Sequence, residues 1–471
     1  MAKSVGTVAA SPLPRQHLLG RLVYAKSIHG RLLWGSVILF GVIMGLASLR
    51  VPIQSLSPEY VYRKDFLQEY TLARAVAEGV DPYQPTALLA ERYLGALPSL
   101  VFPHPTPHPP PIGVLLLPLS LLDYHTAAAV WLAVEIAALG LSVYLIGRAK
   151  RARLPAYGIL AIALIAVGWE PISVGMTLGQ LMLPMLALLA GAWLAFHSGR
   201  RTVGGVLVGL AIAIKPVPWP LILLFAVRRD WRALAGAVST IVATYVVAVL
   251  AVGPGRLVAY VTEVLPAVNT AYRADPWNIS AASLGWRVFS GTGSQVQAGI
   301  VAPPLIEFNA VAAGVSYLII VLIILAASFV AWRQPIFDIA YSVVICASVL
   351  ASPISWEHYF ALLVIPISQV FSWLADRRLP AKETSAAIGV ALLLAFPQRA
   401  WTWIALVATG GEELAATSHV PVPAGLALIT LMPAVAVAAL ACLLVWLGGR
   451  GGSTAPTTLG ARQPGLVHER Q

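Results

Sequence analysis

Long apolar runs recur from one end of the chain to the other, and they restrict its fold more than any other feature. A run of about 18 or more apolar residues matches a helix that crosses a hydrocarbon core about 30 Å thick. The alternation of apolar and polar residues that is typical of membrane β-barrels does not occur in these runs. The sequence therefore predicts an all-α, polytopic membrane protein. The longest runs are residues 32–49, 125–147, 233–252, 308–332 and 424–447.

Composition agrees with a membrane protein. Only 11% of the 471 residues are charged and 58% are hydrophobic, whereas about a quarter of a soluble protein is charged. The net charge is +11, but Lys and Arg occur in short clusters between apolar runs, as in cytoplasmic anchors. We therefore expect no nucleic-acid partner. Cys346 and Cys442 both lie in apolar runs, which argues against a disulfide framework.

The basic clusters set the expected topology. The first apolar run is too long for a signal-peptide core and is interpreted as a retained anchor. Because positive clusters favour the cytoplasm, residues 1–31 are expected inside, with two large outer loops at about 50–109 and 253–304. We expect short amphipathic helices in these loops. Residues 32–450 are expected to form one transmembrane domain, followed by a disordered cytoplasmic tail at 451–471.

About a dozen membrane segments follow from this topology, with both chain ends inside. The Pro-rich stretch 109–122 is expected to enter only part of the bilayer, which is tolerated where protein or a watery cavity surrounds it. Stretches 203–214 and 217–227 are expected to form a hairpin with Lys215 and Pro216 at its outer tip. The other segments are expected at 156–169, 181–196, 336–350, 359–374 and 386–406.

Polar and charged side chains gather on the outer side in this topology. Such groups are expensive at membrane depth and usually mark function. Carboxylates, bases, imidazoles and Trp rings around one outward cavity are typical of an active site at the outer leaflet, and not of a continuous transport path. The candidates are Asp65, Tyr70, Asp81, His104, Gln180, Lys215, Asn278, Arg287, Trp356, Glu357 and His358.

Asp65 opens an expected amphipathic helix along the membrane surface, since Phe66, Tyr70 and later apolar residues follow it at helical spacing. One interpretation is electrostatic, because a carboxylate favours a helix N-terminus and Arg63 and Lys64 supply counter-charges. The other is a catalytic base, because carboxylates with perturbed pKa values cluster at functional sites. The residues around Asp65 leave both interpretations open.

Lys215 and His358 also allow two interpretations each. Lys215 precedes Pro216 at a helix break, where it could reach the interface or neutralise a phosphate as a point charge. His358 could pair with the interfacial Trp356 or donate to a phosphate oxygen. Glu357 could hold the ring of His358 or face water.

Weaker signals come from the other polar positions. Gln180 follows Gly179 at a helix start, so its amide could cap that helix or bind a sugar hydroxyl. His104 and His108 lie four residues apart in a proline-rich segment, without the helical register of a metal site. We expect a rigid loop there, although His104 could touch a phosphate. Asn278 begins a formal glycosylation sequon, a short motif that often occurs by chance.

Several motifs, in their order along the chain, resemble those of the polytopic glycosyltransferases of the C superfamily, specifically glycosyltransferase family 87. Each motif is short, and the resemblance rests on their order and spacing over most of the chain. The motifs are Asp65 with Tyr70, the turn 79–83, the prolines before 112, Trp131, residues 179–180, 215–216, 277–280 and 352–358.

The resemblance implies a GT-C type helical bundle that moves a sugar, expected to be mannose, from a polyprenyl phosphate to a hydroxyl of an envelope glycolipid or glycan. It also implies an outer-loop aspartate as general base, a role that falls by position on Asp65. An inverting displacement needs cationic or hydrogen-bonding partners for the departing phosphate, and we expect these at Lys215, His358 and Arg287. Because polyprenyl phosphate leaves as a stable anion, we expect no metal and no cofactor. Substrate contacts are expected from Tyr70, Asp81, His104, Gln180, Asn278, Trp356 and Glu357.

Two rival functions are a secondary transporter or lipid-linked sugar flippase, and an acyl- or phospho-group transferase. Transporters tend to have paired halves with broken helices, and this sequence has one broken hairpin without a matching half. A transferase of another group would also use outward acid–base residues. We expect a monomer in a bacterial plasma membrane, surrounded by membrane lipids, with its active site facing outward.

Overall fold

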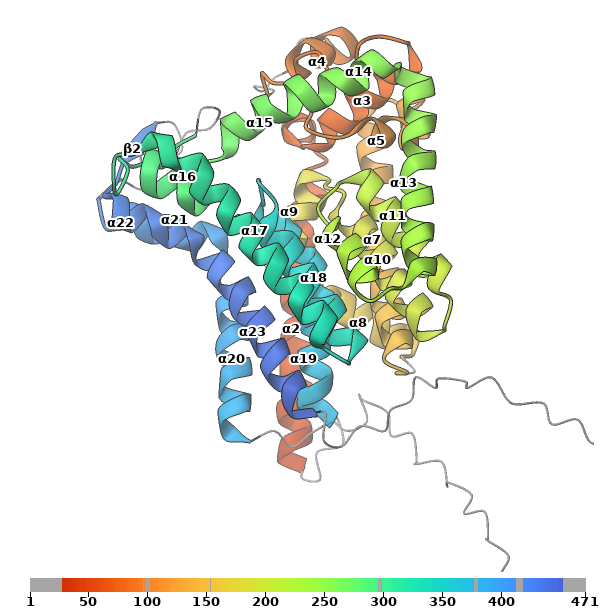
Figure 1. Ribbon diagram of the computed structural model, residues 1–471, viewed down its shortest axis with the longest axis vertical. Coiled ribbons are helices and arrows are strands. Elements are labelled where there is room, and N and C mark those ends of the chain that lie inside the picture. Colours follow the sequence, from red (N-terminus) through yellow and green to blue (C-terminus); the bar gives the residue numbers. More distant parts are fainter. Residues whose placement is uncertain are drawn as a thin grey trace, which may run out of the picture.

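The computed structural model describes residues 28–95, 97, 102–152, 154–294, 296, 299–376, 380–411 and 418–451. The predicted cytoplasmic segment lies outside the described residues as far as residue 27, and the predicted tail lies outside them from residue 452. Helices make up almost all of the regular structure that is described (Figure 1). This architecture agrees with an all-α membrane protein.

Five helical stretches in the described part of the chain are long and apolar enough to cross a membrane. Each of them contains one of the five longest apolar runs of the sequence, or most of it. They lie in α2 (Ile28–Gln54), α7 (Tyr124–Ala149), α13 (Trp231–Val252), α17 (Asn309–Arg333) and the stretch Ala424–Gly449, which ends in α23 (Met432–Gly451).

Two pairs of helices are sharply bent. α8 (Ala156–Val167) meets α9 (Glu170–Leu178) at 85°. α20 (Ala381–Ala395) meets α21 (Gln398–Val407) at 74°, so the stretch predicted as one span at 386–406 is broken. Proline accounts for both bends, because it starts a helix well but does not continue one: the second residue of α9 and the residue before α21 are prolines.

Counting each bent pair as one span gives seven candidate spans among the described residues. The dozen segments expected from the sequence therefore stay a prediction. Shorter apolar helices lie between these spans. They are α10 (Met182–His197), α11 (Arg201–Ile214) and α18 (Phe337–Ala351).

Short helices occupy the two regions predicted as outer loops, and all of them except α16 lie at the upper end of the molecule in Figure 1. A π-helical turn at Tyr260–Val264 joins two of them into one continuous helical stretch. The helices are α3 (Phe66–Ala77), α4 (Thr86–Leu94), α14 (Pro254–Ala259), α15 (Leu265–Tyr272) and α16 (Ser283–Ser290).

The Pro-rich stretch after the first of these regions forms two short helices, α5 (Pro110–Leu115) and α6 (Leu117–Ser120), which pack against α3. β1 (Gly299–Val301) and β2 (His419–Pro421) pair in parallel. The remaining elements are η1 (Val61–Arg63), α12 (Pro220–Val227), η3 (Glu357–Leu363), α19 (Val364–Asp376), α22 (Ala424–Ala427) and η4 (Leu428–Leu431).

Glycines allow α11 and α13 to approach at backbone distance. A Cβ added at Gly205 would lie 2.0 Å from the carbonyl oxygen of Ala233, and one at Gly209 would lie 2.4 Å from that of Ala237. Small residues at helix interfaces permit such approach in membrane proteins, where van der Waals packing replaces the hydrophobic drive. The close pair fixes the position of the turn that follows α11.

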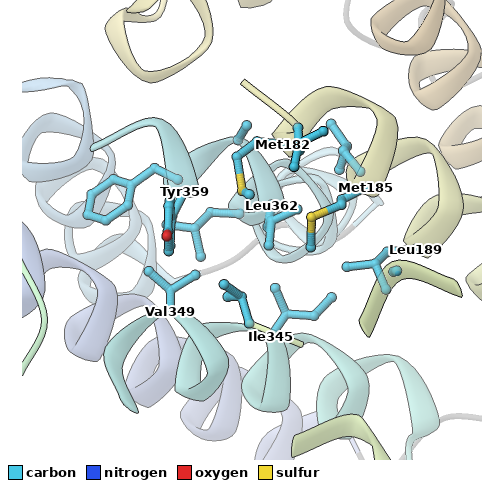
Figure 2. Close-up of a cluster of buried hydrophobic side chains, with 14 of the residues drawn as sticks. Met182, Met185, Leu189, Ile345, Val349, Tyr359 and Leu362 are labelled. Carbon is cyan, nitrogen blue, oxygen red and sulfur yellow. The ribbon is translucent and has the colours of Figure 1, made fainter. Parts of the chain in front are cut away.

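A buried apolar cluster anchors η3 between α10 and α18. Met182 and Met185 of α10 pack toward Ile345 and Val349 of α18, and Leu362 of η3 lies between them (Figure 2). All five of these side chains are buried. The ring of Tyr359 lies at the edge of the same cluster in Figure 2, so the core holds the first turn of η3 in place.

Candidate active site

One large cavity, with a volume of about 1430 Å³, lies among the elements at the upper end. Its wall includes the start of α3, the proline-rich segment before α5, the α9–α10 junction, the turn after α11, α15 and the start of η3. It exceeds the roughly 300–1,000 Å³ of ordinary ligand pockets. Seven of the residues singled out from the sequence line it, namely Asp65, His104, Gln180, Lys215, Trp356, Glu357 and His358.

Asp65 occupies the N-cap position of α3, but its side chain makes no capping hydrogen bond. Its Oδ2 instead accepts a hydrogen bond from Gln180 Nε2 at 2.5 Å. A capping carboxylate would accept from a backbone N–H in the first turn of the helix. The capping interpretation thus describes the position of Asp65 correctly, but the carboxylate contacts the cavity wall.

The backbone before Gln180 explains how this amide reaches Asp65. Gly179 ends α9 with a φ of +73°, a left-handed conformation that favours glycine. A Cβ at Gly179 would lie 2.8 Å from Phe66 Cβ. Trp131 of α7 stacks on Phe66 and donates from Nε1 to the Gly179 carbonyl at 2.9 Å. The tight turn therefore holds Gln180 directly against the start of α3.

Lys215 follows α11 in an extended conformation, and its ammonium group turns into the cavity. Nζ donates to Gln180 Oε1 at 3.4 Å and lies 4.5 Å from the centre of the Tyr359 ring. Gln180 thus connects Asp65 to Lys215, and we call these three side chains the Asp65–Gln180–Lys215 bridge. Both contacts hold the lysine inside the cavity, where it can meet an anion.

The protonation of Asp65 is finely balanced. Burial and, second to it, the negative charge of Glu69 raise the pKa of Asp65 to about 7. The hydrogen bond from Gln180 and the positive charges of Lys215 and Lys64 act in the opposite direction. A carboxylate with a pKa near neutrality can both take up and release a proton at physiological pH.

Glu357 and His358 are the first two residues of η3, and both line the cavity. In the described residues, His358 Nε2 has no hydrogen-bond partner, and burial, Lys215 and His108 lower the pKa of its ring. A neutral imidazole can donate one hydrogen bond from that nitrogen. Glu357 does not hold the ring of His358, because its Oε1 accepts from the backbone N–H of Gln398 at 3.3 Å, at the start of α21.

His104 belongs to an aromatic group on the wall of the cavity. Its Nε2 lies 2.7 Å from the hydroxyl of Tyr272, and its Nδ1 lies 2.8 Å from the carbonyl oxygen of Pro105. The Tyr272 ring meets Trp356 edge-on, with 5.2 Å between ring centres. The sequence analysis missed Tyr272, because nothing in the pattern of α15 distinguishes a tyrosine that faces a cavity from one that faces lipid.

Four residues expected at the site do not line the cavity: Tyr70, Asp81, Asn278 and Arg287. Tyr70 donates its hydroxyl to the Leu122 carbonyl. Asp81 is exposed and accepts from the backbone N–H of Tyr83. The sequence motifs located these polar residues but gave no information on the direction of their side chains.

Asn278 and Arg287 instead organise the second outer region. Asn278 is fully buried, and its amide donates to the carbonyls of Tyr272 and Pro353, both at 3.1 Å. Arg287 is also buried and donates to the backbone carbonyls of Asp275 and Asn278, each at 2.6 Å. These bonds connect the end of α15 to the segment that leads into η3. Both residues therefore hold parts of the cavity wall in position without lining the cavity.

Comparison with known proteins identifies the family. The family model of glycosyltransferase family 87 matches residues 107–353, which is more than half of the chain. The chain belongs to glycosyltransferase family 87. It is therefore a membrane glycosyltransferase. The matched segment contains Gln180 and Lys215, whereas Asp65 precedes it and His358 follows it.

Curated relatives include two kinds of sugar transferase. The polyprenol-phosphate-mannose-dependent alpha-(1-2)-phosphatidylinositol pentamannoside mannosyltransferase of Mycolicibacterium smegmatis is 30% identical over 319 residues, 66% of this chain and 68% of that protein. Its namesake in Mycobacterium tuberculosis is 29% identical over 63% of this chain and 67% of that protein. An alpha-(1->3)-arabinofuranosyltransferase of Corynebacterium glutamicum is 31% identical over 43% of this chain and 45% of that protein. No solved structure is significantly similar to the chain.

Proposed function

We propose that this glycosyltransferase moves a mannosyl group from polyprenyl phosphate mannose to a hydroxyl of an envelope glycolipid or glycan, at the outer face of a bacterial plasma membrane. The Asp65–Gln180–Lys215 bridge on the wall of one large cavity supports this proposal most strongly. It places a carboxyl group with a pKa near 7 close to a lysine ammonium group. Mannose is favoured over arabinose because the mannosyltransferase relatives match 66% and 63% of the chain, and the arabinofuranosyltransferase 43%.

Asp65 acts as the general base in this proposal. Its carboxylate takes the proton of the acceptor hydroxyl while that oxygen forms a bond to the anomeric carbon. The bond from the same carbon to the phosphate oxygen breaks, and its electron pair leaves with the polyprenyl phosphate. Attack from the face opposite the phosphate inverts the anomeric centre. The pKa of about 7 suits this role, because a base works best when its pKa lies near the operating pH.

Lys215 and His358 receive the departing phosphate. Lys215 supplies a positive charge, and its cation–π contact with Tyr359 holds it in the cavity between turnovers. His358 supplies a neutral donor from Nε2. Preorganised donors of this kind lower the barrier because they are already aimed at the charge that develops in the transition state. Arg287 is left out of this set, because its guanidinium is buried against backbone carbonyls.

The polyprenyl chain of the donor lies along an apolar rim of the cavity close to Lys215. Trp219, Val261, Leu265 and Tyr317 all line the cavity, and between 38% and 56% of each residue is exposed. They come from the residue before α12, the π-helical turn, α15 and α17. An isoprenoid tail needs such an apolar surface next to the cation that binds its phosphate, so the rim and Lys215 together fit an amphipathic donor.

Purified protein with radiolabelled polyprenyl phosphate mannose and an envelope lipid extract tests the proposal. We expect labelled glycolipid from the wild type, and a loss of about 10²–10⁴-fold for Asp65→Asn, the usual contribution of a general base. Asp123→Asn is the matched control. Asp123 caps α7 from an exposed position, and asparagine caps a helix as well as aspartate does.

Two results would contradict the proposal in different ways. Turnover by Asp65→Asn at the wild-type rate would show that Asp65 is not the general base, but it would not contradict the proposed donor. Transfer from another polyprenyl phosphate sugar, with none from the mannose donor, would show that the sugar is not mannose, but it would not contradict the proposed mechanism.

A further inference from the structure

We propose that Glu69 and His108 form a buried positioning pair that controls the charge felt by Asp65, and thereby sets the pH at which the base becomes ionised. The inference rests on the proposed role of Asp65 as base. It assigns a function to two residues that neither the reaction scheme nor the sequence motifs require.

The geometry of α3 brings Glu69 next to Asp65. The two residues are four positions apart, at the start of the same helix, and side chains at this spacing lie on one face about 5–6 Å apart at Cβ. Glu69 is fully buried. Asp65 reaches the cavity, whereas Glu69 does not line it. The second carboxylate therefore acts on the first from inside the protein and cannot itself touch the acceptor.

His108 completes the pair from a distant part of the chain. Its Nε2 lies 3.0 Å from Glu69 Oε1, and the exposed side-chain fractions are 3% for His108 and 0% for Glu69. A buried carboxylate is costly unless a hydrogen-bonded counter-charge accompanies it. His108 lies at ion-pair distance from Glu69, and its imidazole supplies such a charge when it is protonated. His108 also lines the cavity, so the pair connects the interior of α3 to the space where the reaction takes place.

The two members of the pair act on Asp65 with opposite sign. The negative charge of Glu69 raises the pKa of Asp65, second only to burial. When its imidazole carries a proton, His108 places a positive charge 3.0 Å from Glu69, which opposes the effect of that carboxylate. Other ionisable or polar groups around the two carboxylates come from the elements that pack on α3 and from the rest of the cavity wall; they are Lys64, His104, Tyr124, Glu135, Gln180, Lys215, Tyr272 and His358.

Labelling with dicyclohexylcarbodiimide tests this without depending on turnover. The reagent is apolar and modifies protonated carboxyl groups, and fragmentation of the peptide that contains both Asp65 and Glu69 gives the fraction modified at Asp65 at each pH. We expect a midpoint near pH 7 in the wild type. Glu69→Gln should lower it by about one pH unit or more, the effect of removing a like charge at short range.

His108→Gln should move the midpoint in the opposite direction. Glutamine keeps an N–H donor for Glu69 but cannot carry the positive charge, so Asp65 should stay protonated to a higher pH. Glu78→Gln is the control, because Glu78 follows α3 at its far end and is exposed; its midpoint should equal that of the wild type.

The proposal is refuted if Glu69→Gln leaves the midpoint of Asp65 labelling unchanged, or if Glu69→Gln and His108→Gln shift it in the same direction. Should Glu69→Gln fail to fold, the upward shift of His108→Gln decides the matter alone. Opposite shifts in a protein that transfers no mannose would keep the pair and refute only the proposed function.

Discussion

Gln180 and Asp65 are 115 residues apart in the chain, yet a 2.5 Å hydrogen bond joins their side chains. The same amide accepts from Lys215, so it separates two opposite charges that would otherwise attract each other directly. A direct ion pair favours the charged carboxylate and lowers its pKa. The hydrogen bond from Gln180 itself lowers the pKa of Asp65 and favours the ionised carboxylate, while the amide leaves the ammonium group of Lys215 available for a phosphate.

Replacing the amide tests this arrangement. Gln180→Leu keeps a similar volume but removes both hydrogen bonds. We expect kcat/KM to fall by about 10–100-fold, because a hydrogen bond to a charged group contributes roughly 1.5–3 kcal/mol. Steady-state kinetics with the mannose donor would measure the loss. Activity within twofold of the wild type would show that the bridge is not needed.

The pKa of Asp65 predicts the acid side of the pH–rate profile. The carboxylate is the active form of the base, and its pKa is raised to about 7. We therefore expect kcat/KM to fall tenfold per pH unit below about pH 7. An ordinary exposed aspartate would move that limb to about pH 4. A rate that stays flat between pH 5 and 8 would contradict the assignment of Asp65 as the base.

The same raised pKa predicts an effect on stability. Between the unfolded and folded pKa values of Asp65 the folded state binds more protons, so Asp65 lowers the stability as the pH rises from about 4 through about 7. Asp65→Asn removes this penalty. The melting temperature of the variant relative to the wild type should therefore be higher at pH 8 than at pH 5, as measured by thermal unfolding in detergent. An equal difference at both pH values would refute this.

Lys215 should act mainly on the donor. Lys215→Gln removes the positive charge next to the apolar rim, and we expect the KM for polyprenyl phosphate mannose to rise by about tenfold or more. Lys215→Arg keeps the charge and should recover part of the affinity. Unchanged donor KM in Lys215→Gln, together with an unchanged kcat, would place the phosphate elsewhere.

Close packing of α11 on α13 predicts a stability defect far from the chemistry. Gly205→Ala places a methyl group 2.0 Å from the Ala233 carbonyl oxygen, and overpacking of this kind costs about 1–3 kcal/mol. Gly140→Ala in α7 is the control, since a Cβ there meets nothing within 4 Å. Alanine is the better helix former by about 1 kcal/mol, so the control should melt at or above the wild-type temperature.

Sequence reasoning located the candidate site better than it assigned individual side chains. Basic clusters placed the segments that contain Asp65, Gln180, Lys215 and His358 on one side, and all four residues line one cavity. Hydrophobic periodicity and charge indicate the path of the backbone, but not the direction of individual side chains. Arg287 does not line the cavity, and the sequence could not show this, because an arginine that satisfies backbone carbonyls has the same sequence signature as one that binds a phosphate.

The long helices of the fold were predicted from the sequence, whereas its helix breaks were not. Apolar runs indicated the five long spans, since a run of that length has few other solutions in a membrane. Helix α9 and the break before α21 were missed, because a proline in an apolar segment is compatible with a kink, a stop or a sharp bend. The pair of Glu69 and His108 was also missed, since it joins an amphipathic helix to a proline-rich segment without periodicity.

The π-helical turn at Tyr260–Val264 determines which way the following residues face. It carries one more residue than an α-helical turn, and each residue of an α-helix corresponds to a rotation of about 100°. Loss of a single codon in this turn would therefore rotate Leu265 and Tyr272 together, moving one away from the rim and the other away from His104. Changes of chain length at this point could thus diversify substrate preference in related enzymes while the membrane bundle stays the same.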